Sequence, residues 1–269
     1  MDLAAEMLSY KFLVRAASVG LMVSLCAALL GVSLVLKRYS MIGDGLSHVG
    51  FGALAAAVAM GASPLGLSIP VVVAAAVLLL RLTDDGGLKG DAAIGLISVS
   101  SLAAGVTAIS LSNGINTDVC NYMFGSILAM SKNDVRLSMA TSAAVLLLFL
   151  LCYNRIFAVT FDENFAKATG TDTGLYNMVI AALTGVTIAV GMRLMGALLI
   201  SGLIIFPAVT SMRVFKSFRG VVLSAAAVSL SSFLAGLMLS YAAGVPAGAS
   251  IVLVNLAFFL LFTAAGRMR

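Results

Sequence analysis

The sequence predicts an all-α membrane protein, a polytopic bundle of about nine transmembrane helices that forms a single domain over residues 1–269. Composition is the first indication: 61% of the residues are hydrophobic, only 10% are charged, and the mean hydropathy is +1.13. A soluble domain of this length needs far more charge to cover its surface. The second indication is that apolar runs of about 20 residues, each long enough to cross a hydrocarbon core roughly 30 Å thick, recur along the chain.

The positions of the spans follow from these apolar runs. In chain order, we expect them at residues 12–36, 46–62, 65–82, 91–112, 135–153, 174–191, 194–213, 219–242 and 247–266. The segment 118–130 is apolar but too short to cross a bilayer, so we interpret it as a short external or re-entrant helix packed against protein. A second short helix is expected in the cytoplasm between the fifth and sixth spans.

Basic residues gather in the connectors between spans. The chain has 16 Lys and Arg against 11 Asp and Glu, a formal net charge of +5. In a polytopic protein such clusters mark cytoplasmic segments, which places the loop 213–219 and residues 267–269 in the cytoplasm. The uncharged connectors 61–65 and 242–246 then lie outside, and so does the N-terminus. This distribution of basic residues indicates that the lipid bilayer surrounds the chain, and it argues against a nucleic-acid ligand.

The segment 41–50, Met-Ile-Gly-Asp-Gly-Leu-Ser-His-Val-Gly, is the most informative stretch for function. Asp44 and His48 are four residues apart, so on a helix their side chains lie on one face, one turn apart. His48 is the single histidine of the chain, and an ionisable group inside a span is costly unless it faces a polar cavity or a partner. A carboxylate and an imidazole are able to share one divalent cation, and imidazole favours zinc, copper, nickel or iron over calcium or magnesium.

A structural interpretation of the same pair is equally compatible with the residues. Asp44 would then be the N-cap of the second span, with its carboxylate accepting from the free N–H groups near Leu46 or Ser47. His48 would be a buried neutral histidine bonded to a backbone carbonyl. As a metal site the pair is incomplete, which suits a transit point that must release its ion. A second copy of the chain in a homodimer would supply further ligands.

The stretch 160–170 predicts a short helix of about two to three turns between two spans. Thr160 and Glu163 have the spacing of a capping box, and Gly170 suits the left-handed conformation that ends a helix. Its apolar side is formed by Phe161, Phe165 and Ala168, and its charged side by Asp162, Glu163 and Lys167. Because the net charge of the helix is negative, docking into a groove of a cytoplasmic partner is favoured over lying on an anionic membrane surface.

Pro207 falls inside the apolar run of the seventh span. Proline has no N–H, so the carbonyl of Leu203 loses its helical partner, and we expect a kink or a break there. Broken helices mark gates or binding points in transporters. A packing kink that the bundle tolerates explains the proline equally well.

Two motifs that the sequence lacks bear on activity. No phosphate-binding loop of the form G-x-x-x-x-G-K-[ST] occurs, so an ATP-driven process requires a separate ATPase chain. One histidine and no G-x-S-x-G motif offer little for an intramembrane hydrolase. We therefore expect a transport subunit rather than an enzyme, with no permanently bound cofactor.

Four motifs, in order, resemble those of the zinc/manganese-type ABC permease family. Residues 40–48 (Ser-Met-Ile-Gly-Asp-Gly-Leu-Ser-His) resemble its signature, and residues 121–128 (Asn-Tyr-Met-Phe-Gly-Ser-Ile-Leu) resemble its external short helix. Residues 161–170 are similar to its cytoplasmic coupling helix, and residues 196–208 to its next span. The resemblance covers nearly the whole chain.

This resemblance implies a fold similar to that of the vitamin B12-type ABC importer permease, working as a homodimer in the bacterial cell membrane. It also implies two cytoplasmic ATP-binding subunits, an extracellular metal-binding lipoprotein, and import of a divalent metal ion by alternating access. Asp44 and His48 match the positions of the family's proposed metal path. The positions that match its coupling helix are Thr160, Phe161, Asp162, Glu163, Phe165, Ala166, Lys167 and Gly170.

The identity of the ion stays open. Residues 36–44 (Leu-Lys-Arg-Tyr-Ser-Met-Ile-Gly-Asp) are most similar to zinc-type permeases of Gram-positive bacteria, so zinc is favoured, with manganese or iron as alternatives within the family. A proton-coupled secondary metal transporter, with Asp44 and His48 as a proton relay, is an alternative from another class.

Overall fold

The computed structural model describes residues 10–84, 90–111 and 132–267, and every regular element within these ranges is a helix. In chain order the helices are α2 (Lys11–Leu36), α3 (Ile42–Ala59), α4 (Pro64–Asp84), α5 (Gly90–Leu111), α7 (Lys132–Leu151), α8 (Tyr153–Phe161), α9 (Glu163–Ala168), α10 (Thr173–Met195), α11 (Ala197–Met212), α12 (Phe218–Ala243) and α13 (Ala247–Arg267). The predicted all-α fold is confirmed. The short helix expected at 118–130 lies outside the described residues.

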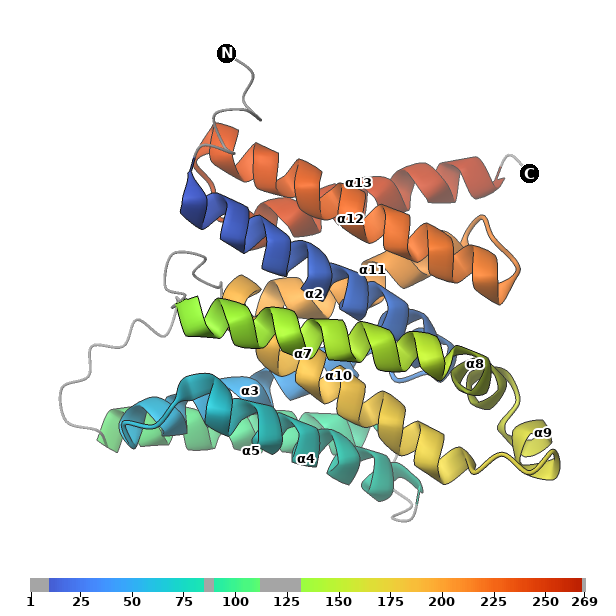
Figure 1. Ribbon diagram of the computed structural model, residues 1–269, viewed down its shortest axis with the longest axis horizontal. Helices are drawn as coiled ribbons and strands as arrows, with labels where there is room; N and C mark the ends of the chain where they lie inside the picture. The colour runs from blue at the N-terminus through green and yellow to red at the C-terminus, as the bar shows by residue number, and fades with distance from the viewer. Residues whose placement is uncertain (1–9, 85–89, 112–131, 268–269) are drawn as a thin grey trace.

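The predicted bundle of about nine spans agrees with the helix lengths. Eight of the described helices are long and apolar enough to cross a membrane, and α11 is a shorter apolar helix of 16 residues. The long helices run side by side in one bundle, with α8 and α9 at the end where α13 finishes (Figure 1). Helix α2 begins at the opposite end. This arrangement is compatible with the predicted placement of the two termini on opposite sides.

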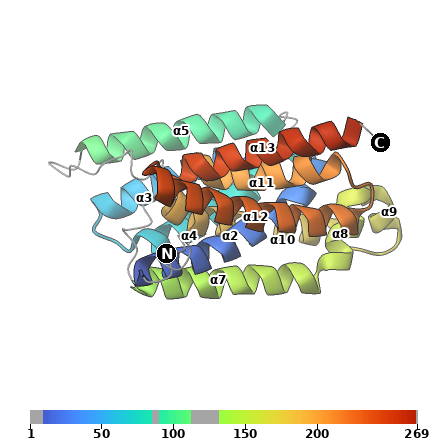
Figure 2. The same cartoon turned by 90° about the horizontal axis from the view of Figure 1, so that it is seen from above.

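Helices α2, α3, α10 and α11 form the centre of the bundle, and most of their residues are buried. Helices α5 and α13 lie on one side of it and α7 on the opposite side (Figure 2). Small residues let the central helices approach closely. A Cβ added at Gly31 of α2 would collide with the carbonyl oxygen of Ile204 in α11. Gly31 therefore fixes how closely α2 and α11 pack.

Several helix ends have local causes in the sequence. The carboxylate of Asp172 accepts from the N–H of Leu175 (3.0 Å) at the start of α10, and the hydroxyl of Ser217 accepts from the N–H of Gly220 (3.2 Å) at the start of α12. Gly244, with φ of 65°, ends α12 in the left-handed conformation. These caps satisfy backbone groups that the helices leave free.

The predicted capping box is wrong. Thr160 belongs to α8, a helix that the sequence pattern does not separate, and its Oγ1 is buried without a hydrogen-bond partner among the described residues. The N-cap of α9 is Asp162, whose Oδ1 accepts from the N–H of Phe165 at 2.9 Å. The short helix α9 spans six residues, which is less than the predicted two to three turns. An aspartate directly before the helix caps it without needing a residue two positions earlier.

The sequence predicts a kink or a break at Pro207, and of these two the described helix α11 shows no break. Helix α11 continues through Pro207, and the chain breaks instead at Gly196, between α10 and α11. Gly196 has φ of 80° and ψ of 164°, a conformation that is essentially restricted to glycine. Proline removes one hydrogen bond, which a packed transmembrane helix tolerates, whereas the Gly196 conformation ends helical geometry outright.

Candidate functional site

Asp44 and His48 lie together in the first turns of α3. The Nε2 atom of His48 is 3.8 Å from Oδ2 of Asp44, and their side chains are 23% and 50% exposed. Asp44 is the third residue of the helix, and the N-cap is Met41, whose side chain makes no capping bond. The N-cap interpretation of Asp44 is therefore wrong. The pair is neither sealed in dry packing nor used to cap the helix.

The neighbours of α3 show which way the pair faces. A Cβ on Gly43 would lie 3.0 Å from Cδ1 of Ile204 in α11, and one on Gly45 would lie 2.5 Å from Cγ2 of Ile94 in α5. Because successive helical residues are about 100° apart, Asp44 points between α11 and α5. His48, four residues later, lies on the same face.

Asp44 and His48 form a pair of potential ligands and no larger cluster among the described residues. Within the described ranges no group of three or more His, Cys, Asp and Glu side chains is able to hold an ion. The Asp44–His48 pair combines one carboxylate and one imidazole, and zinc, manganese and iron all accept such a mixture to different degrees. The arrangement suits a weak site that becomes complete with ligands from outside this chain.

Helix α9 presents an aromatic surface beside the end of α8. Phe161 and Phe165 are each 65% exposed, and Phe161 stacks on Phe157 with ring centroids 5.5 Å apart. Asp162, Lys167 and Gly170 are also exposed. Ala166, in contrast, is fully buried, so it anchors α9 to the bundle and faces no partner. Phe161 and Phe165 therefore place two exposed aromatic side chains at this end of the bundle.

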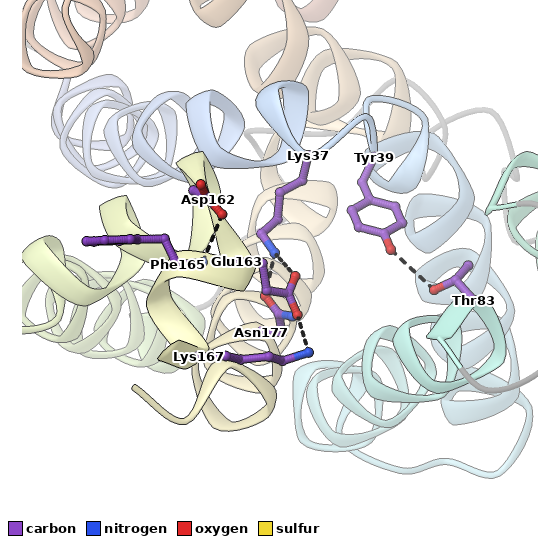
Figure 3. A network of polar contacts seen from close by, with 8 residues as sticks. All are labelled: Lys37, Tyr39, Thr83, Asp162, Glu163, Phe165, Lys167 and Asn177. Atoms are coloured by element: carbon purple, nitrogen blue, oxygen red, sulfur yellow. Dashed lines mark hydrogen bonds and ion pairs between the residues drawn. The ribbon is translucent and has the colours of Figure 1, made fainter. Parts of the chain in front are cut away.

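A polar network joins α9 to two distant helices (Figure 3). Lys37, which follows the last residue of α2, donates to Oδ1 of Asn177 in α10 at 2.6 Å. Its Nζ also lies 3.3 Å from Oε2 of Glu163, and Lys167 lies 3.4 Å from the other oxygen, Oε1. The sequence pattern indicates Glu163 and Lys167 as site residues but not Lys37 and Asn177. Lys37 is 126 positions from Glu163 and 140 positions from Asn177, so no local pattern reveals these contacts.

The network also determines the charge of Glu163. Partial burial raises the pKa of this carboxyl, but the charge of Lys37 and hydrogen bonds from Asn177, Lys37 and Lys167 outweigh burial and lower its pKa from the ordinary value of a glutamate. Glu163 is therefore ionised at neutral pH, and its interaction with Lys37 is charge-assisted.

Pro207 and Arg193 mark two other features of α10 and α11. Pro207 is buried in α11, which packs against α2, α3 and α13. At the end of α10, Nη2 of Arg193 lies 3.3 Å from Oδ2 of Asp134 in α7, and both side chains are mostly buried. This ion pair ties α7 to α10 next to the break at Gly196.

Comparison with known proteins agrees with the fold and with these motifs. The family profile described as the ABC 3 transport family matches residues 9–266. The chain is 28% identical to the high-affinity zinc uptake system membrane protein ZnuB of Haemophilus influenzae, covering 94% of this chain and 97% of that protein. It is 27% identical to the manganese import system permease protein ScaB of Streptococcus gordonii, covering 94% and 90%.

A solved structure is similar over the same extent. PsaBC from Streptococcus pneumoniae, in complex with a Fab, superimposes on this chain with a TM-score of 0.83 at 29% identity, covering 97% of this chain and 94% of that one. A profile match over almost the entire chain, together with this superposition, shows the family. The chain is a multi-pass membrane protein that belongs to the ABC 3 transport family.

Proposed function

We propose that this chain is the permease subunit of an ATP-binding cassette importer that moves a divalent metal ion, zinc in the first place, across the bacterial plasma membrane. The observation that carries the proposal is the pair on α3. Asp44 and His48 lie 3.8 Å apart on a partly exposed face of a helix inside an apolar bundle. Ionisable groups within a membrane-spanning helix are characteristic of ion pathways.

The donor atoms favour zinc. An imidazole nitrogen suits zinc better than manganese, whose preferred ligands are carboxylate, carbonyl and water oxygens. Relatives named for zinc and for manganese match this chain about equally well, so the preference rests on His48. Manganese and iron are the alternatives within this function.

A homodimer completes the site in this proposal. Asp44 and His48 point into the space between α5 and α11, where this chain supplies no further ligand cluster among its described residues. If two copies meet at this face, two carboxylates and two imidazoles surround one ion. Four such ligands match the tetrahedral coordination that zinc prefers.

ATP hydrolysis is supplied by a separate subunit in this proposal. The exposed side chains of Phe161 and Phe165 on the α8–α9 surface dock into a groove of that subunit, and a metal-loaded lipoprotein delivers the ion from outside. Movement of α9 then opens the passage at Asp44 and His48 to one side of the membrane at a time.

The test is uptake of radioactive zinc into vesicles that contain the chain and its ATPase, with the metal-binding lipoprotein supplied outside. We expect accumulation that requires both ATP and the ATPase, that a protonophore leaves unchanged, and that excess zinc suppresses more strongly than excess manganese. Uptake by the chain alone, driven by a proton gradient, would overturn the proposal in favour of a secondary transporter. Stronger suppression by manganese would overturn the preference for zinc.

A further inference from the structure

Lys37 connects the proposed docking helix to the bundle through two different acceptors. Its ammonium group donates to Asn177 of α10, which is buried, and to Glu163 of α9, which is 39% exposed. The Lys37 side chain itself is only 12% exposed. An ammonium group has three donors, so it is able to hold both acceptors at once. Lys37 therefore has one partner inside the bundle and one on the helix at its surface (Figure 3).

The chain that leads from Lys37 to Asp44 is short and tightly bonded. The N–H of Tyr39 donates to the carbonyl of Leu34 at 2.8 Å, and the N–H of Ile42 donates to the carbonyl of Tyr39 at 3.1 Å. The Tyr39 hydroxyl lies 3.4 Å from the hydroxyl of Thr83 at the end of α4. Arg38 adopts φ of 64°, a left-handed conformation that is unfavourable for residues other than glycine. The hydrogen bonds on either side of Arg38 hold it in this conformation.

The connector between α2 and α3 is short, and hydrogen bonds restrict its backbone. Only residues 38–41 separate Lys37 from the first residue of α3, and Asp44 lies in the first turn of that helix. A displacement of Lys37 is therefore passed to α3 instead of being absorbed by a flexible loop. The side chain of Lys37 contacts α9, and its backbone begins the segment that leads to Asp44 and His48.

We propose that Lys37 is a positioning residue that transmits the displacement of α9 to Asp44 and His48. This inference rests on the proposed function, in which the ATPase moves α9. A shift of Glu163 relative to Asn177 changes the position of the ammonium group between its two acceptors, and the short connector passes this displacement of Lys37 to the start of α3. The Lys37–Glu163 contact is then part of the coupling between ATP hydrolysis and the metal passage, in addition to holding α9 in place.

The test is a reporter that does not depend on metal transport. In the complete complex with its ATPase, the native cysteines Cys26, Cys120 and Cys152 are replaced by Ala and the substitution His48→Cys is introduced. The rate at which a charged, water-soluble thiol reagent modifies position 48 is compared between the nucleotide-free complex and the complex trapped with ATP and vanadate. We expect the two rates to differ by about fivefold or more when Lys37 is present.

The Lys37→Met substitution should abolish this nucleotide dependence, because methionine keeps an unbranched side chain of similar length and lacks the charge and the N–H donors. Lys37→Arg should retain it, and the double substitution Lys37→Glu with Glu163→Lys should restore it. The matched control is Lys216→Met, which removes an exposed lysine from the connector between α11 and α12 and should leave the nucleotide dependence intact.

Two results would overturn the role of Lys37. One is a nucleotide-dependent rate that Lys37→Met leaves unchanged in the assembled complex. The other is a rate that does not respond to nucleotide even with Lys37 in place, since there would be no motion to transmit. Failure of the metal function gives a different result: the complex with the unaltered chain then takes up no zinc, while the His48→Cys reporter still responds to nucleotide and still requires Lys37.

Discussion

The packing of α3 against α5 gives a prediction whose size follows from the structure. A Cβ on Gly52 of α3 would lie 2.6 Å from the carbonyl oxygen of Ser101 in α5. A carbon and a carbonyl oxygen approach to about 3.3 Å at closest, so Gly52→Ala requires the two helices to separate by roughly 0.7 Å. Overpacking of this kind costs about 1–3 kcal/mol.

Gly95→Ala on α5 is the matched control. Gly95 is exposed, and a Cβ there meets no atom within 4 Å. Both substitutions replace a helical glycine by alanine and gain about 1 kcal/mol of helix propensity. The difference in free energy of unfolding between the two variants therefore isolates the clash at Ser101.

The assay is thermal unfolding of the purified chain in detergent. We expect the apparent melting temperature of the Gly52→Ala variant to lie roughly 4–8 °C below that of the Gly95→Ala variant, which corresponds to a difference of about 2 kcal/mol. Equal melting temperatures would refute the close approach of α3 and α5. The position of the Asp44–His48 pair between α5 and α11 would then lose its support.

Three further predictions concern the ion pairs and the choice of metal. Arg193→Met breaks the mostly buried ion pair with Asp134 and should destabilise the chain by roughly 1–3 kcal/mol in the same thermal assay, whereas Arg193→Lys should be milder. Because the pKa of Glu163 is lowered on folding, its contribution to the docking of α9 is present above the ordinary pKa of a glutamate and is lost as the pH falls through the lowered value. Hydrogen exchange of α9, corrected for the intrinsic effect of pH, should show this loss. Glu163→Gln should reduce the pH dependence, and what is left belongs to the other carboxylate of α9, the N-cap Asp162. His48→Asp replaces the imidazole by an oxygen ligand and should shift competition in the uptake assay from zinc towards manganese, and an unchanged preference would contradict the role given to His48.

Much of the fold was predictable because the membrane makes span length a strong constraint. A run of apolar residues such as 219–242 admits few structures other than a membrane-crossing helix, and α12 extends from Phe218 to Ala243. Short elements were harder to predict. The apolar stretch that joins α7 to α8 has no break signal in its composition, so α8 was not separated from the loop that follows the fifth span. The capping box failed because Asp162, directly before α9, competed with Thr160 for the same role.

The candidate site was predictable only where its geometry is local. Asp44 and His48 are neighbours because they are four residues apart on one helix, and their spacing alone indicates this. Lys37 and Asn177 come together through the packing of α2 on α10, which no short pattern encodes. In the same way, the sequence marks Pro207 as the weak point of a helix, but the bundle keeps α11 continuous there and places the break at Gly196.

The passage of metal at the Asp44–His48 pair is tested most directly by ATP-driven zinc uptake in complexes that carry Asp44→Ala or His48→Ala. Uptake is expressed per assembled ATPase, and Ser100→Ala on the exposed face of α5 is the control, since its hydroxyl bonds only within its own helix among the described contacts. We predict that both site variants assemble with the ATPase and take up zinc at background level, while the control keeps the wild-type rate. Wild-type uptake by both site variants would contradict the assignment of this pair to the ion's route.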